Sequence, residues 1–317
     1  MTTKSILTRL GPFFGLLLVI ALFSIPTEVR GHFLTYVNFK IILTQTVIVA
    51  LGALGMTLII VSGGIDLSVG STVAFTSVVG ALLIQRGWPA AAVVVAVVAT
   101  GGGIGLLNGT AIAGLRMTPF IITLGTLGVV RGAAKWLAGS ETVNSDQTDI
   151  NSWMTTADPF GWSLPAGAWV ALVAAVGTAV MLRQTVFGRH IFAIGSNEAT
   201  ARLCGVPTVR TKILIYTAAG AFFGLSGLMQ LSRLRQGDPT VAVGLELDII
   251  AAVIIGGASL SGGVGTVLGS MIGALIIAVL RNGSQQMDWP TYFQEIIIGV
   301  VIIAAVFLDR LRQPKSG

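Results

Sequence analysis

The feature that most constrains this chain is a succession of long apolar stretches with almost no charge. Hydrophobic residues make up 54% of the 317 residues, and Asp, Glu, Lys and Arg together only 10%, against roughly a quarter charged in soluble globular chains. A membrane-spanning helix needs about 20 apolar residues, because backbone polar groups cannot be left unpaired in hydrocarbon. The sequence therefore predicts an all-α integral membrane protein.

A hydropathy window of that length predicts about ten transmembrane helices, some of them short or interrupted by glycine. The first is interpreted as a membrane helix and not as a cleaved signal, because no small-x-small cleavage site follows it. No stretch between helices is long enough for a stable soluble domain, so we expect one membrane domain over residues 1–317. The predicted spans lie near 11–26, 41–62, 67–84, 90–113, 119–137, 164–182, 213–231, 247–257, 264–280 and 292–308.

The distribution of charge predicts how the helices are oriented, because Lys and Arg collect in cytoplasmic loops. Residues 183–212 carry a cluster of cations and are expected in the cytoplasm: Arg183, Arg189, Arg202, Arg210 and Lys212. Counting spans outward from this loop places both termini in the cytoplasm as well. Residues 139–165 contain no Lys or Arg and are expected outside; their acids are Glu141, Asp146, Asp149 and Asp158.

Several function classes are disfavoured by composition. The net charge of +6 comes from few acids and not from a basic cluster, so nucleic-acid binding is not expected. Cys204 is the single cysteine and there are two histidines, which gives no basis for a disulfide or a metal site. The chain has no Gly-Lys pair for a phosphate-binding loop and no GxSxG elbow. We therefore predict no catalytic residues, no metal and no cofactor bound by this chain, and no enzyme activity of its own.

Two glycine-rich segments repeat one pattern. GGIDLSVG at 63–70 is echoed by GGASLSGG at 256–263, and GALLI at 80–84 is echoed by GALII at 273–277 at the same offset. Glycine-interrupted segments in the two halves of a transporter are typical of a substrate site, because a broken helix exposes backbone groups to a cavity. Tight turns between helices need glycine equally. Both interpretations remain open at this stage.

Asp66 is the acid most nearly embedded in apolar sequence. A carboxylate inside the membrane is by default a functional candidate. An Asp just before a helix is also a good N-cap, favoured by the helix dipole. Ser68 accompanies Asp66 in either interpretation, as a pathway residue or as part of a cap.

Glycines also recur every four residues within apolar runs, where they favour close helix packing over phosphate binding. The two ladders are Gly101, Gly105 and Gly109, and Gly265, Gly269 and Gly273.

Residues 183–212 are also expected to contain a short helix with a signal at each end. Asn197 can cap its start, Glu198 suits its positive first turn, and Gly205 is placed for a left-handed stop before Pro207. Such a short helix is marginal alone in water, so it is suited to fit a groove in a partner. The alternative is a solvated loop helix without a partner.

Four motifs taken together resemble those of a known family over nearly the whole chain. They are GGIDLSVGS at 63–71, TPFIITLGT at 118–126, GRHIFAIGSNEATARLCGV at 188–206 and ELDIIAAVIIGGASLSGGVGTVLG at 246–269. In these segments the chain resembles the permease subunits of monosaccharide ABC importers, the ribose permease group.

The resemblance implies a multi-pass protein of the bacterial inner membrane that forms a homodimer or a paired permease. It also implies cytoplasmic ATP-binding subunits that hydrolyse the ATP, and a periplasmic or lipid-tethered sugar-binding protein. The cytoplasmic helix would then be the coupling helix that docks in the ATPase, with Cys204 where a small polar residue is more usual. Its predicted docking residues are Gly195, Asn197, Glu198, Ala199, Arg202 and Gly205.

A path for a neutral, hydroxyl-rich solute needs Asn, Ser and Thr side chains with some apolar wall, and not fixed charges. The predicted pathway residues are Asp66, Ser68, Asn108, Thr118, Phe120, Thr123 and Ser261. The alternatives are an ion-coupled secondary transporter or channel, which needs charged or carbonyl-rich sites deep in the bilayer, and an ABC permease for branched-chain amino acids, whose zwitterionic cargo would want a paired carboxylate and cation.

Overall fold

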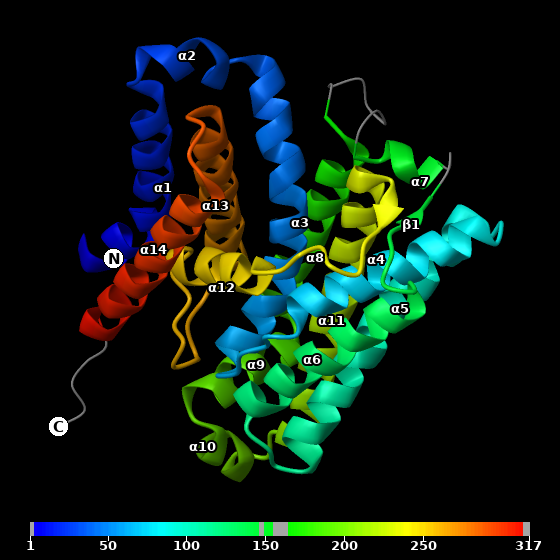
Figure 1. The fold of residues 1–317 in the computed structure, drawn as a ribbon. Coiled ribbons are helices and arrows are strands. Elements are labelled where there is room, and N and C mark those ends of the chain that lie inside the picture. Colours follow the sequence, from blue (N-terminus) through cyan, green and yellow to red (C-terminus); the bar gives the residue numbers. More distant parts are fainter. Residues whose placement is uncertain (1–2, 146–148, 155–163, 313–317) are drawn as a thin grey trace.

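The computed structural model describes residues 3–145, 149–154 and 164–312, and these form an almost entirely helical protein (Figure 1). Parts of the predicted external loop, residues 146–148 and 155–163, lie outside the described residues, as do the terminal residues 1–2 and 313–317. In chain order the helices are α1 (Thr3–Ser24), α2 (Thr27–Phe33), α3 (Tyr36–Val61), α4 (Val69–Gln85), α5 (Ala90–Gly109) with a π-helical continuation η1 (Thr110–Gly114), α6 (Pro119–Leu137), α7 (Asp149–Ser152), α8 (Ala166–Gln184), α9 (Val186–Ser196), α10 (Glu198–Leu203), α11 (Thr208–Leu234), α12 (Leu245–Ile255), α13 (Val267–Gln286) and α14 (Thr291–Arg312).

The strands of the described residues are two short pieces, β1 (Val143–Asn144) and β2 (Gln236–Gly237), which pair antiparallel with Val143 opposite Gly237. They join the segment after α6 to the end of α11 at one end of the helix bundle (Figure 1). The predicted all-α class is confirmed, apart from this small two-stranded sheet.

Six of the described helices are long and apolar enough to cross a membrane: α3, α5 with η1, α6, α8, α11 and α13. Shorter apolar stretches lie in α1, α4 and α14. The helix α12 has 11 residues and is about 16 Å long at 1.5 Å per residue, about half the thickness of a bilayer core. Helices occupy all the predicted spans, and the count of ten membrane crossings stays a prediction.

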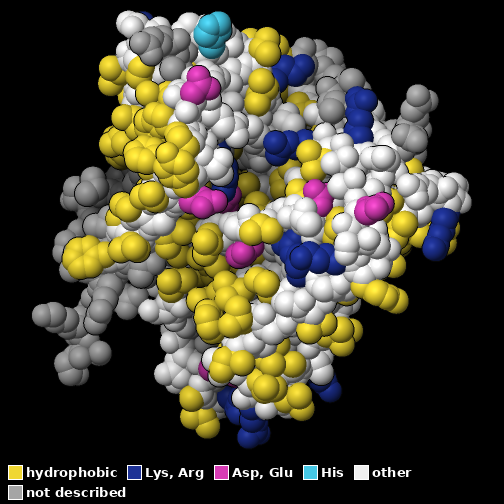
Figure 2. Space-filling view, in the orientation of Figure 1, with side chains coloured by type: hydrophobic (Ala, Val, Ile, Leu, Met, Phe, Trp, Pro, Cys, Tyr) yellow, Lys and Arg dark blue, Asp and Glu magenta, His cyan; other side chains and the backbone are white. Residues whose placement is uncertain are grey.

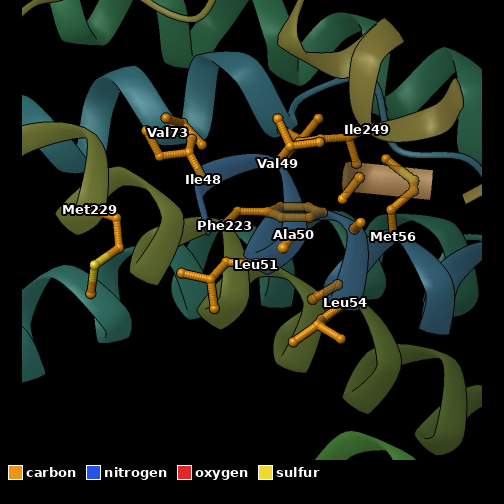
Figure 3. Close-up of a cluster of buried hydrophobic side chains, with 14 of the residues drawn as sticks. Ile48, Val49, Ala50, Leu51, Leu54, Met56, Val73, Phe223, Met229 and Ile249 are labelled. Carbon is orange, nitrogen blue, oxygen red and sulfur yellow. The ribbon is translucent and has the colours of Figure 1, made fainter. Parts of the chain in front are cut away.

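The core is organised around α3, which is buried on all sides from Val47 to Val61. A helix that is apolar all round belongs in the interior, and α11, α12, α13 and α8 pack around it. Figure 3 shows Leu51, Leu54 and Met56 of α3 in one cluster with Phe223 of α11 and Ile249 of α12. The central helix thereby joins segments that are far apart in the sequence.

The outer helices carry the opposite pattern, because large apolar side chains point outward from them. Leu18 of α1 is 67% exposed, and Ile121 of α6 and Ile303 of α14 are exposed to a similar degree. Hydrophobic side chains cover much of the face in Figure 2. A surface of this kind is stable against lipid chains and not against water.

Both glycine ladders lie where helices touch, so the predicted close packing is confirmed. A Cβ on Gly105 would collide with the backbone carbonyl of Tyr216, and one on Gly101 would collide with that of Gly220, at the contact of α5 with α11. Likewise a Cβ on Gly273 would collide with the carbonyl of Ala252, where α13 meets α12. Small residues let these backbones approach each other directly.

Candidate functional site

The two repeated glycine-rich segments lie side by side in the fold. We call residues 62–68, between α3 and α4, the first loop, and residues 256–266, between α12 and α13, the second loop. The amide of Gly263 donates to the carbonyl of Val61 over 2.8 Å, and a Cβ on Gly262 would stand 3.0 Å from the Cα of Gly63. Both loops also touch Gly195, near the C-terminal end of α9. Two hairpins of helices therefore turn at the same place in the protein.

Each loop contains the same side-chain turn. In the first loop the amide of Ser68 donates to Asp66 Oδ1 over 2.7 Å. At the repeated position of the second loop, the amide of Ser261 donates to Ser259 Oγ over 3.3 Å. The sequence repeat is therefore also a structural repeat, with an Asp in one copy and a Ser in the other.

The first loop is the centre of a buried polar network. Asp66, which is 1% exposed, accepts at Oδ1 from Ser68 Oγ over 2.6 Å and at Oδ2 from Asn108 Nδ2 over 3.3 Å. Asn108 Nδ2 also donates to Ser68 Oγ over 3.1 Å. Thr126 Oγ1 donates to Asn108 Oδ1 over 2.6 Å. The network joins the start of α4 to α5 and α6.

Four of the seven predicted pathway residues belong to this region. Thr123 joins Asp66, Ser68 and Asn108 there, because its hydroxyl lies 2.9 Å from the carbonyl of Pro119 and 3.4 Å from that of Ile65. The other three lie elsewhere: Ser261 is exposed in the second loop, Phe120 is 51% exposed on α6, and Thr118 lies beside α10.

Two members of this region were missed in the sequence. Thr126 closes the TPFIITLGT motif and lies three residues after Thr123, which places both on one face of a helix. Tyr216 of α11 lies with its buried hydroxyl against Gly64, so closely that a Cβ there would collide with it. Helical spacing alone could have identified Thr126, whereas Tyr216 depends on how α11 packs.

The short helix α10 has the predicted signals at both ends. Asn197 accepts from the amide of Thr200 over 2.9 Å, and Gly205 has a left-handed φ of 84°. Glu198 pairs with Lys212 at 2.6 Å, which ties α10 to the start of α11. On the outer face Leu203 is 89% exposed. The preceding helix α9 was not expected from the sequence.

A cavity of about 760 Å³ opens beside α10. One wall is formed by α10 itself, and the other by the end of η1 and the turn into α6, including Thr118. Three cations, Arg116, Arg202 and Lys212, line it with the single acid Glu198. Figure 2 shows Lys and Arg side chains at this lower end of the molecule, where Figure 1 places α10.

A second cavity of about 210 Å³ lies between α3, α11, α12 and α13. Asp248 of α12 forms an ion pair there with Arg281 of α13, with 2.8 Å from Asp248 Oδ2 to Nε and 2.6 Å to Nη2. Neither Asp248 nor Arg281 was among the predicted pathway residues. Acidic and basic side chains gather across the middle of the face in Figure 2, at the level of α12.

Buried long helices, a lipid-compatible surface and broken helices around a central junction define a multi-pass membrane transport protein. Residues 38–306 match the family model described as the permease component of branched-chain amino acid transport systems. The chain belongs to this family of transport permeases, and it is a multi-pass protein of the bacterial inner membrane.

Curated relatives cover nearly the full chain. The ribose import permease of Escherichia coli K12 is 37% identical over 94% of both chains. The L-arabinose ABC transporter permease of Azospirillum brasilense is 34% identical over 94% of this chain and 88% of its own length. The galactose/methyl galactoside import permease of Escherichia coli K12 is 35% identical over 99% of this chain and 98% of its own length. No solved structure matches the chain.

Proposed function

We propose that this protein is the membrane-spanning permease subunit of an ATP-driven importer of monosaccharides. The observation that carries the proposal is the full-length similarity to permeases named for ribose, arabinose and galactose, at 34–37% identity. The four motifs that resemble the ribose permease group occupy the two loops, α6 and the α9–α10 region. One membrane domain over residues 1–317 with no catalytic residue of its own fits this role.

The energy enters through α10, which acts as the coupling helix for a cytoplasmic ATP-binding subunit. Leu203 offers an apolar side chain at 89% exposure, and Ala199 and Arg202 are exposed on the same short helix. The 760 Å³ cavity beside it gives an acidic segment of the ATPase a cationic wall to enter. ATP is bound and hydrolysed by that partner, and this chain holds no cofactor.

Movement of α10 is passed into the membrane by direct contacts. The Glu198–Lys212 pair connects α10 to α11, and Gly195 just before α10 touches both loops. ATP binding in the partner favours one arrangement of these helices over the other, which is the differential interaction that alternating access requires. The sugar then follows a path near Asp66, Ser68, Asn108 and Thr123.

This role sets the orientation and the other partners. The loop of residues 183–212 faces the cytoplasm together with both termini, in agreement with the positive-inside rule. The acidic external loop seats a periplasmic or lipid-tethered sugar-binding protein. A second copy of this chain, or a paired permease, completes the pathway.

Two other functions make different demands. A branched-chain amino acid carries both charges, and the paired Asp248 and Arg281 already satisfy each other over 2.6 Å. An ion-coupled transporter would need a deep ionisable site, and the two buried carboxylates of the described residues, Asp66 and Asp248, are both engaged by neighbouring side chains. Relatives named for sugars over the full chain favour the importer.

The test replaces residues 198–204 with a Gly/Ser linker in the complete importer. We expect sugar uptake to be abolished, because the partner ATPase loses its docking site. The permease itself should still insert and accumulate in the membrane. Leu203→Asp is a milder variant that adds a charge to the exposed face of α10. Its control is Leu234→Asp, at the C-terminal end of α11. Normal uptake by the linker variant, or accumulation by the permease alone from an ion gradient, would contradict the proposal.

A further inference from the structure

The 210 Å³ cavity lies far from α10, beside the last turns of α11. The helix α11 starts at Thr208, a few residues after α10, and has 27 residues, so it is about 40 Å long at 1.5 Å per residue. Gln230 and Arg233 line the cavity from the last turns of α11. A bilayer core is about 30 Å thick. The cavity and the coupling helix are therefore separated by the thickness of the membrane.

The cavity walls combine amide groups, an ion pair and apolar surface. The polar side chains come from four helices that are far apart in the sequence: Gln45, Gln230, Arg233, Asp248, Arg281 and Gln285. Apolar side chains such as Ile48 and Leu245 complete the walls. Recognition sites for sugars need such a mixture, because hydroxyl groups require hydrogen bonds while C–H faces require apolar contacts.

Two acceptor atoms on these residues have no hydrogen-bond partner among the residues that the structure describes. Asp248 is 3% exposed, and its Oδ2 is taken by Arg281 while its Oδ1 is buried with no hydrogen bond. Gln45 Oε1 is buried and unpaired as well. Buried acceptors without donors are rare, and here two of them line one cavity that is open to a molecule from outside. Hydroxyl groups of a solute supply such donors.

We infer that this cavity is an outer binding site for one monosaccharide, in which Asp248 Oδ1 and Gln45 Oε1 accept hydrogen bonds from sugar hydroxyls. Arg281 holds Asp248 in place and balances its charge, so the site favours a neutral hydroxylated solute over an amino acid. Its volume of about 210 Å³ gives room for a single small sugar. The inference rests on the proposed function and deepens it.

The direct test measures binding of ribose, arabinose and galactose to the full-length permease in nanodiscs by saturation-transfer NMR, with leucine as a second probe. We expect a sugar signal that weakens about tenfold in Gln45→Leu, equivalent to about 1.4 kcal/mol. Asp248→Asn should also weaken it and change the preference among the sugars. Gln286→Leu is the matched control, because Gln286 also has a buried unpaired Oε1 but does not line the cavity.

Undiminished sugar signals in both cavity variants would overturn the inference, as would a loss of equal size in Gln286→Leu or binding of leucine in place of sugar. Uptake by the complete importer separates this from the proposed function. If wild-type protein accumulates no sugar, the proposed function fails. If it accumulates sugar and Gln45→Leu leaves both rate and sugar preference unchanged, only the outer site fails.

Discussion

The two glycine-rich loops share a sequence pattern and a turn, but they are held in different ways. In the first loop the carboxylate of Asp66 reaches beyond its own turn to Asn108 of α5. In the second loop Ser259 stands at the repeated position and accepts from the amide of Ser261, while the amide of Gly263 donates to the carbonyl of Val61 in α3. Val264, near the end of the second loop, is 57% exposed. The first loop thus reaches a neighbouring helix through the side chain of Asp66, and the second loop reaches α3 through its backbone.

This difference matters because α9 touches both loops at Gly195. When α10 moves, the same displacement reaches a loop anchored by a buried polar network and a loop held through its backbone. We expect the first loop to move as one body with α4, α5 and α6. We then expect the second loop to move relative to the first loop when α10 is displaced.

The largest effect is expected from Gly195→Ala, which breaks the junction of the two loops. A Cβ at this position would collide with the carbonyl of Val61 and stand 2.5 Å from the amide of Gly263. Both are backbone atoms and cannot rotate away, so the cost should reach about 3 kcal/mol, the upper part of the overpacking range. The yield of folded permease, measured by size-exclusion chromatography of a fluorescent fusion, should fall several-fold.

The control for this variant is Gly125→Ala, because a Cβ on Gly125 meets nothing within 4 Å. It should leave the amount of folded protein unchanged. A well-folded Gly195→Ala protein with normal transport would show that the two loops do not depend on this contact.

An intermediate effect is expected from Asp66→Ser, which makes the first loop resemble the second. Serine can still accept from the amide of Ser68, but it cannot reach Asn108, whose amide nitrogen loses an acceptor in the buried network. The expected destabilisation is about 1–3 kcal/mol, read as a lower midpoint of thermal aggregation in detergent. Combining it with Asn108→Ala should cost less than the sum of the two single variants. Strict additivity would mean that Asp66 and Asn108 do not act together.

The sequence contained most of this comparison but not its geometry. Hydropathy predicted where the helices lie, and the glycine ladders predicted the contacts of α5 with α11 and of α12 with α13. Asn197 and Gly205 predicted the two ends of α10. Each of these features is a local signal in the sequence. The repeat of the two loops was also visible. Their meeting at Gly195, and the partners of Asn108 and Asp248, depend on which helices pack together, and no local pattern encodes that.

The smallest effect is expected from Ser259→Ala in the second loop. The hydrogen bond that its hydroxyl oxygen accepts from the amide of Ser261 is 3.3 Å long, beyond the usual range for N–H···O bonds, so the loss of this bond should contribute about 0.5–1 kcal/mol. The thermal midpoint should shift less than in Asp66→Ser, measured side by side. Equal shifts in the two variants would show that the loops are anchored alike, and the asymmetry between them would then have to come from the backbone contacts at Gly262 and Gly263.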